Sequence, residues 1–197
     1  MSKLKKWFSF FYWILIGGLV IAIMLAYAYF FSQSPEPSSV PIKLSEVGVV
    51  ADFKFEVRKH FIYSFSMRFS YSENDQVERA RVRKLLGGIA VDKLGKPLEP
   101  GTPTPINLTI FAVCRGGQEV AVYSQDVDPI LASWGDGRFG KNIGNHVLTP
   151  GLYRARLLNK RASPEFKLIP ITFEMRMPAK VVFDPEKKPT RSEPCQQ

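Results

Sequence analysis

Two stretches of alternating apolar and polar residues stand out along the chain. In residues 49–58, alanine, phenylalanine and valine alternate with charged side chains from Ala51 onward. In residues 61–71, the same period of two places a row of mainly aromatic side chains on one face. This period is the signature of a half-buried β-strand. Because the link Lys59-His60 is short, we predict that the two strands form an antiparallel hairpin.

The pattern changes in residues 74–86, where good helix formers replace β-branched residues. Asn74 or Asp75 can cap a helix here, and Gly87-Gly88 can end it. Four apolar residues are expected to pack on the sheet and four basic residues to point outward: Val77, Ala80, Leu85 and Leu86, and Arg79, Arg81, Arg83 and Lys84. The basic run indicates a solvated helix face, with binding to an acidic patch as the alternative.

Further strands follow toward the C-terminus. Residues 106–114 and 118–127 flank Gly116-Gly117 and predict a second hairpin, and residues 152–158 and 165–177 predict two more strands. Residues 129–148 contain five Gly or Pro residues and predict an irregular loop. Seven or so strands with one interrupting helix indicate an all-β fold. We expect an immunoglobulin-like or jelly-roll β-sandwich with one inserted helix, whose topology the pattern leaves open.

The stretch from Trp7 to Phe31 is apolar, carries no charge and is long enough to span a bilayer, which needs about 20 such residues. Lysines precede it, and no Lys or Arg follows until Lys43. This asymmetry predicts a single-pass helix in the inner (cytoplasmic) membrane, with the C-terminal domain in the periplasm. A cleavable signal peptide ending near Ala26-Tyr27-Ala28 is the alternative. A retained anchor fits better, because signal peptides have an apolar region of only about 7–15 residues.

These features divide the chain into five predicted segments. Ser32–Pro41 is rich in Pro and Ser, which indicates an extended spacer, and the C-terminal segment is polar and rich in Pro. The segments are a cytoplasmic tail (1–6), a transmembrane helix (7–31), a linker (32–42), an extracytoplasmic β-sandwich domain (43–183) and a disordered tail (184–197).

The chain is basic, with 27 Lys and Arg against 18 Asp and Glu and a net charge of +9. A basic surface outside the cytoplasm favours anionic headgroups, envelope polymers or an acidic protein partner, and general solubility is the simpler reading. No nucleic-acid partner is expected there. The two cysteines, Cys114 and Cys195, can pair in an oxidising compartment, and the sequence leaves open whether they do.

No motif of an enzyme or of a cofactor site stands out. The chain contains no G-x-S-x-G, no H-E-x-x-H and no P-loop. His60 and His146, its only histidines, have no sequence context for acid–base chemistry. We therefore expect no enzyme activity, no cofactor and no metal.

The irregular stretch contains the preferred contact residues. It mixes aromatic, acidic and basic side chains, and loops on a rigid scaffold often carry recognition. The predicted binding residues are Trp134, Asp136, Arg138, Phe139 and Lys141. The alternative is that Trp134 and Phe139 only fold the loop onto the core. Asp136 has no second carboxylate nearby, which argues against a metal site.

The layout from Asn107 to Met177 resembles a family of uncharacterised envelope proteins of Gram-negative bacteria. Three features carry the resemblance: Pro105-Ile106 before a strand, the run Leu148-Thr149-Pro150-Gly151-Leu152-Tyr153-Arg154, and the closing stretch from Pro164-Glu165-Phe166 to Ile171-Thr172-Phe173-Glu174. The face Tyr63-x-Phe65-x-Met67-x-Phe69 also matches. The resemblance implies a single β-sandwich domain, often in a lipoprotein. This chain has a predicted spanning helix where a lipid-modified Cys stands in such proteins.

Some similar proteins are thought to protect cells against toxins delivered by contact-dependent secretion. The resemblance thus implies an immunity protein that neutralises a periplasmic toxin by covering its active site. Our leading hypothesis is a membrane-anchored periplasmic binding protein with a protein partner. The alternative is a non-catalytic accessory subunit of an envelope complex.

Overall fold

The computed structural model describes residues 18, 20, 21, 23 and 24, residues 38–94 and 97–178, and residues 183, 184 and 195. The chain divides into two compact units, Met1–Pro35 and Glu36–Gln197. The described residues of the first unit are helical, and their side chains are exposed. Among the residues described, no helix is long and apolar enough to cross a membrane. The predicted transmembrane segment, residues 7–31, lies largely outside them.

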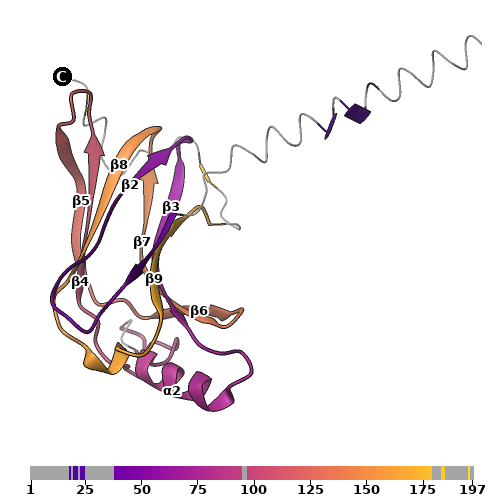
Figure 1. Cartoon of the computed structure of the whole chain (residues 1–197), viewed down its shortest axis with the longest axis vertical. Coiled ribbons are helices and arrows are strands. Elements are labelled where there is room, and N and C mark those ends of the chain that lie inside the picture. Colours follow the sequence, from indigo (N-terminus) through magenta and orange to yellow (C-terminus); the bar gives the residue numbers. More distant parts are fainter. Residues whose placement is uncertain are drawn as a thin grey trace, which may run out of the picture. The chain divides into compact units, whose positions relative to one another are not determined.

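The described part of the second unit is the predicted all-β sandwich, with two antiparallel sheets (Figure 1). One sheet has the order β1 (Ser38–Ile42), β9 (Ile171–Arg176), β3 (Phe61–Ser70), β7 (Arg138–Leu148) and β6 (Leu131–Gly135). The other has the order β2 (Gly48–Val57), β8 (Gly151–Asn159), β4 (Ile106–Val113) and β5 (Glu119–Val127). The α-helix α2 (Gln76–Leu86) and the short 3-10 helix η1 (Pro164–Phe166) complete the described elements of this unit.

Aromatic side chains from both sheets fill the space between them. Phe55 of β2 meets Phe65 of β3 with ring centroids 6.1 Å apart, and Phe53 meets Phe173 of β9 at 5.7 Å. Met67 is buried in the same core. Each fully buried side chain of this size contributes roughly 1.5–3 kcal/mol to folding. The alternating faces seen in the sequence therefore hold the two sheets together.

Both alternating stretches form strands, but the hairpin predicted between them is wrong. β2 pairs with β8, whereas β3 pairs with β7 and β9 in the other sheet. The link Lys59-His60 thus carries the chain from one sheet to the other. Alternation shows which face of a strand is buried, but it does not identify the neighbouring strand. The second predicted hairpin is confirmed by the pairing of β4 with β5.

Part of the predicted linker belongs to the sandwich. β1 pairs with β9 from Ser38↔Met175 to Ile42↔Ile171, so the first strand begins five residues before Lys43. Pro41 fits an edge strand, because one row of backbone groups there has no ladder partner. Ile42 is buried in the core. The short apolar period of Val40 and Ile42 was hidden by the surrounding Pro and Ser residues.

Helix α2 forms as predicted, but of its four predicted apolar contacts only Leu85 and Leu86 pack against the core. The Asp75 carboxylate accepts hydrogen bonds from two backbone N–H groups of the first turn, and this identifies Asp75 as the N-cap. Val82 and Leu86 are buried, whereas Val77 is 80% exposed and Ala80 is also exposed. The helix packs through its C-terminal half. Its N-terminal half projects from the sandwich.

The stretch predicted to be an irregular loop is a pair of strands. β6 and β7 form a hairpin, and a bulge in β7 interrupts the period of two. Two glycines hid the strand from the sequence pattern. A side chain at Gly140 would collide with Ser133 and Arg68, and one at Gly144 would collide with the His146 ring. A Cβ at either position would have to displace a polar side chain that lies beside the strand.

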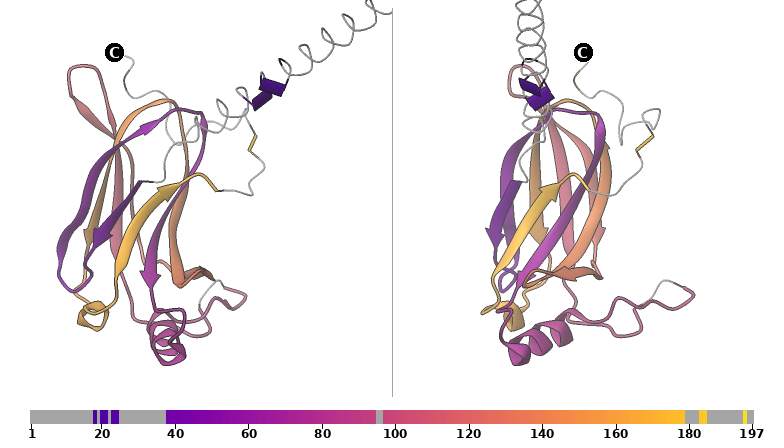
Figure 2. Two further views of the ribbon diagram at one scale, coloured as in Figure 1. Left: turned by 45° about the vertical axis from the view of Figure 1, so that its right-hand side comes forward. Right: turned by 90° about the vertical axis from the view of Figure 1, so that its right-hand side faces the viewer.

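The last predicted strand is shorter than expected. Residues 164–166 form η1, and β9 begins only at Ile171. The backbone N–H of Ser70 donates to the Pro170 carbonyl oxygen at 2.9 Å, which joins the start of β9 to the end of β3. β1 is antiparallel to β9, and β9 is antiparallel to β3, so β1 and β3 run in the same direction. Because α2 follows β3, β1 runs toward α2 and begins at the end of the sandwich away from the helix. Figure 2 shows α2 at the end opposite the turn between β4 and β5.

The two cysteines are bonded to each other. Cys114, in the turn after β4, forms a disulfide with Cys195, and their Cα atoms are 5.2 Å apart. This distance lies in the usual range for a disulfide. The structure thus resolves a pairing that the sequence left open. Most of the tail that was predicted to be disordered, residues 184–197, lies outside the described residues, but Cys195 is attached to the sandwich.

Candidate binding site

The hairpin of β6 and β7 ends in a two-residue turn. Trp134 faces Phe139 and Gly135 faces Arg138 across the hairpin, which leaves Asp136 and Gly137 as the turn residues. Both have positive φ angles, 48° and 67°. An Asp-Gly pair with positive φ at both positions matches the twist of antiparallel strands. This dipeptide was the signal in the sequence that predicts a hairpin instead of a loop.

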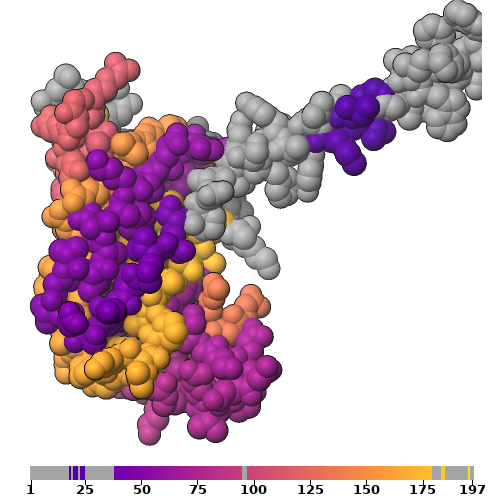
Figure 3. Space-filling model, viewed as in Figure 1, coloured from indigo at the N-terminus to yellow at the C-terminus, as the bar shows by residue number. Residues whose placement is uncertain are grey.

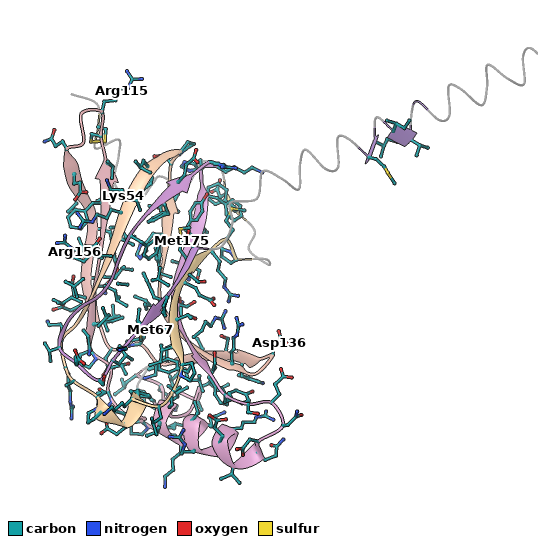
Figure 4. The ribbon with its side chains drawn as sticks, in the orientation of Figure 1. Lys54, Met67, Arg115, Asp136, Arg156 and Met175 are labelled. Atoms are coloured by element: carbon teal, nitrogen blue, oxygen red, sulfur yellow. A yellow bond between two sulfur atoms is a disulfide. The ribbon has the colours of Figure 1, made fainter. Side chains whose placement is uncertain are left out.

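Three of the five predicted contact residues are on the surface of this hairpin. Trp134 is 56% exposed, and Asp136 is exposed at the turn (Figure 4). Arg138 is exposed as well, and its guanidinium lies 3.8 Å from the Glu174 carboxylate. That carboxylate also accepts a 3.1 Å hydrogen bond from Arg68 Nε.

Phe139 and Lys141 point into the domain. Both are therefore removed from the predicted set of contact residues. Each is only 2% exposed. Phe139 packs against Tyr71 with ring centroids 4.8 Å apart. The two positions are two residues apart along β7, so they share the face of the strand that is turned toward the core. For Phe139, the alternative reading of the sequence, in which the aromatic residue holds the segment onto the core, is the correct one.

Lys141 fastens a loop to the sandwich. Its Nζ donates to Thr104 Oγ1 at 3.1 Å and lies 3.4 Å from the Thr102 carbonyl oxygen. Burial lowers the pKa of Lys141 to about 8, and the carboxylate of Asp128 partly opposes this shift. The backbone N–H of Thr102 in turn donates to the Leu85 carbonyl oxygen at the end of α2. Lys141 therefore holds the loop that is bonded to the end of α2, and it does not contact a binding partner.

A hollow of about 270 Å³ lies between α2 and the hairpin. In Figure 3 the helix and the hairpin lie next to each other at one end of the domain. The residues that line the hollow come from both elements: Gln76, Arg79, Ala80 and Arg83 from α2, and Trp134 and Phe139 from the hairpin. The sequence pattern indicated the basic helix and named Trp134 as a candidate contact residue, without relating the two. Only the fold places them around one space.

The two arginines of the hollow lie one helical turn apart, so they share a face of α2. Arg83 Nε donates to the Gly87 carbonyl oxygen at 3.0 Å, which orients its guanidinium. The Arg79 guanidinium lies 6.0 Å from the centroid of the Tyr71 ring, which itself packs on Phe139. No ion pair with a carboxylate of the described residues is formed by either guanidinium. Both charges thus remain available to a ligand.

Acidic residues near the hollow have other partners. Asp75 caps α2, and Glu78 accepts a 2.9 Å hydrogen bond from the backbone N–H of Ser72. On the outer face of the second sheet, by contrast, arginines are neutralised. Arg154 pairs with Asp52 and Glu119 there, and these contacts lower the pKa of Asp52 and raise that of Arg154. The guanidiniums at the hollow therefore differ from that of Arg154, whose charge is neutralised within the sheet.

The structure offers little for acid–base or metal chemistry in its described part. His146 is buried beside Tyr123, and its Nε2 has no hydrogen-bond partner. Burial lowers the pKa of His146 to about 4, so the ring is neutral near pH 7. Among the described residues, no three His, Cys, Asp or Glu side chains are grouped so that they can hold a metal ion.

A second hollow, of about 500 Å³, lies at the other end of the sandwich. It is lined by the turns after β4 and β7 and by the disulfide, with the exposed Arg115 and Leu152 at its edge. Figure 4 shows Arg115 and Asp136 toward opposite ends of the domain. The two neighbouring arginines and the exposed tryptophan that line the first hollow have no counterpart among the described residues of the second. We therefore take the hollow beside α2 as the candidate binding site.

Comparison with known proteins identifies the domain. A solved structure from Sulfurospirillum deleyianum, GEBA250068378, is similar with a TM-score of 0.62 and 22% identity, covering 75% of this chain and 100% of that one. A structure of infectious bursal disease virus, Gx strain, covers 73% of this chain and 33% of the viral one, with 9% identity and a TM-score of 0.27. A search of curated proteins found no match. Residues 39–177 match the model of DUF5625, a domain of unknown function, and the chain belongs to that family.

Proposed function

We propose that the protein is a membrane-anchored binding protein of the periplasm, which holds a protein partner at the hollow between α2 and the β6–β7 hairpin. The observation that carries the proposal is the exposed Trp134 facing two arginines without acidic partners. Trp and Arg are enriched among the residues that contribute most to protein interfaces. A largely exposed tryptophan costs solvation free energy in the isolated protein, and a partner that covers it recovers this free energy.

The anchor is part of the proposal. The uncharged stretch from Trp7 to Phe31 and the preceding lysines support a single span with the domain outside the cytoplasm. The disulfide between Cys114 and Cys195 supports the same placement, because disulfides persist mainly in oxidising compartments. The chain enters the sandwich on the side away from α2. β1 therefore begins at the end of the sandwich away from the hollow.

The resemblance to envelope proteins that protect against delivered toxins suggests a toxin as the partner. Under this reading the domain acts by covering the toxin, and it needs no chemistry of its own. The buried, neutral His146 fits a non-catalytic role. An accessory subunit of an envelope complex would use the same anchor but would bind through several membrane proteins.

Within the all-β class, the strand order favours a jelly roll over an immunoglobulin-like sandwich. Setting β6 aside, successive strands alternate between the sheets except for the β4–β5 hairpin, and the orders are β1-β9-β3-β7 and β2-β8-β4-β5. Two four-stranded sheets built in this way are the arrangement of a jelly roll, whereas constant-type immunoglobulin domains have sheets of four and three strands. β6 is then an addition to the common frame, and it carries the exposed tryptophan.

Affinity capture tests the proposal. The full chain, solubilised in detergent, is offered to envelope extract from its own host, next to a Trp134→Ala variant and an Arg81→Ala control on the exposed part of the same helix. We expect one dominant protein at near-stoichiometric yield with the wild type and the control, and a large loss with Trp134→Ala. Equal capture by all three chains contradicts the site. Capture of several membrane proteins, in equal amounts by the wild type and the Trp134→Ala variant, supports the accessory-subunit alternative.

A further inference from the structure

We infer that the hollow beside α2 recognises an acidic segment of the partner, with a carboxylate between the two arginines and an apolar side chain against Trp134. This inference rests on the proposed function and adds the chemistry of the bound group. Two observations carry it: which residues line the hollow, and the lack of a carboxylate partner for its two arginines among the described residues.

The two arginines give the hollow a positive charge, which favours an anionic ligand. Arg79 and Arg83 share one face of α2, and no carboxylate of the described residues pairs with them. Arginine binds carboxylates through two parallel hydrogen bonds, and such charge-assisted bonds are stronger than neutral ones. A carboxylate placed here meets two donors that the fold has already brought together.

The other residues that line the hollow favour contact with an apolar side chain. Trp134 is 56% exposed at the rim, the buried Phe139 forms the floor and Ala80 lies on the helix side. The volume of about 270 Å³ is below the range of roughly 300–1,000 Å³ that is common for small-molecule sites. The hollow thus suits one or two side chains of a peptide better than a whole cofactor.

The donors are held in place before binding. Arg83 is fixed by its bond to the Gly87 carbonyl oxygen, and Arg79 lies over the Tyr71 ring. Tyr71 packs on Phe139, which continues into the core. Side chains that are already ordered lose less conformational entropy on binding, so a weak anionic contact here yields more affinity than one with free arginines.

Trp134 offers a direct measurement. The chain has three tryptophans, and the other two, Trp7 and Trp13, lie in the predicted anchor. A full-length Trp7→Phe/Trp13→Phe chain in detergent therefore reports only on Trp134. The probes are three peptides that differ only at the central pair: acetyl-Leu-Glu-Glu-Leu-amide, acetyl-Leu-Gln-Gln-Leu-amide and acetyl-Leu-Lys-Lys-Leu-amide.

We expect the Glu peptide to change the Trp134 emission saturably and to bind about tenfold more tightly than the Gln peptide, as charge-assisted hydrogen bonds imply. The Lys peptide should produce no saturable change. The Arg79→Gln/Arg83→Gln variant should lose the preference for Glu over Gln, and the Arg81→Gln control should keep it. Circular dichroism confirms that each variant is folded. An Arg83→Lys variant retains the charge if the double variant fails to fold, and it should keep part of the preference.

Equal affinity for the Glu and Gln peptides overturns the inference, and so does an equal loss in the Arg81→Gln control, which would indicate unspecific attraction. The capture experiment separates this failure from that of the proposed function. If capture depends on Trp134 but survives Arg79→Gln/Arg83→Gln, the acidic-segment inference is wrong while the binding function stands. If the Glu peptide binds selectively but no protein is captured, the inference stands and the proposed function is contradicted.

Discussion

At the scale of single residues, two polar side chains of β7 lie inside the sandwich. Lys141 and His146 are 2% and 6% exposed. Lys141 has oxygen atoms to bond with, whereas His146 Nε2 has none among the described residues. Burial disfavours the charged form of both groups, so their pKa values fall. Each residue therefore makes stability depend on pH in a range of its own.

The Lys141→Met variant tests the first of these ranges. The folded pKa of about 8 is below the ordinary 10.5, so the unfolded chain holds more protons between these values. Wild-type stability should then rise from pH 8 to 10, on the order of 1 kcal/mol per pH unit. Burial raises the pKa values of Tyr63 and Tyr123, which opposes the rise above pH 10. Urea unfolding at pH 8 and 10 should show a flatter profile for the variant; parallel profiles would contradict the assignment.

His146 acts on the acid side. Its folded pKa of about 4 is below the ordinary 6.5, so acidification from pH 6.5 to 4 protonates the unfolded chain first and destabilises the fold. We expect a wild-type loss on the order of 2–3 kcal/mol from this group. Subtracting the profile of His146→Leu from that of the wild type isolates it from carboxylates such as Asp52, whose pKa is lowered by Arg154. A pH-independent difference would show that the ring is not buried as a neutral group.

At the scale of elements, α2 and the β6–β7 hairpin differ in how well local sequence describes them. The helix has a cap, good helix formers and a terminal glycine, and all of these signals are local. The hairpin has its Asp-Gly turn, but its second strand contains glycines that make room for Arg68 and His146. Arg68 comes from the neighbouring strand β3, and His146 lies two residues further along β7 itself. A local pattern thus predicts the helix and misses the strand.

The cap offers a prediction at this scale. Asp75→Ala should destabilise the domain by about 1 kcal/mol, because two backbone N–H groups lose their acceptor. Asp75→Asn should retain most of the stability, since Asn caps equally well. Asn74→Ala is the matched control, as the sequence allowed either residue to be the cap. Urea unfolding measures all three, and an effect of Asn74→Ala as large as that of Asp75→Ala would assign the cap to the wrong residue.

At the scale of the whole molecule, contacts between distant parts of the chain decide the architecture. The strands of each sheet come from separate parts of the sequence, and β1 closes one sheet against β9, near the other end of the domain. The disulfide joins residues 81 positions apart and ties the C-terminal segment to the turn after β4. Such long connections lower the entropy of the unfolded chain more than short ones.

Removing the disulfide tests this contribution. In the chain-entropy description, a loop of this length is worth about 4.5 kcal/mol of stability, and disulfides typically deliver about 2–4 kcal/mol. We expect reductant to lower the urea midpoint of the wild type accordingly, and to leave a Cys114→Ala/Cys195→Ala variant, already less stable, unchanged. If the oxidised wild type is no more stable than the double variant, the bond does not constrain the unfolded chain.

The sequence by itself determined the class of the fold, the position of α2 and most of the strands, because period-two and helical patterns are local consequences of burial on one face. It also indicated the basic helix, and it left open whether Trp134 contacts a partner or folds onto the core. The tertiary structure alone decided which strands pair, that Ser38–Ile42 belongs to a sheet, and that Phe139 and Lys141 face inward. It also brought Arg79 and Arg83 to Trp134. Each of these depends on neighbours far away in the sequence, which a local pattern does not contain.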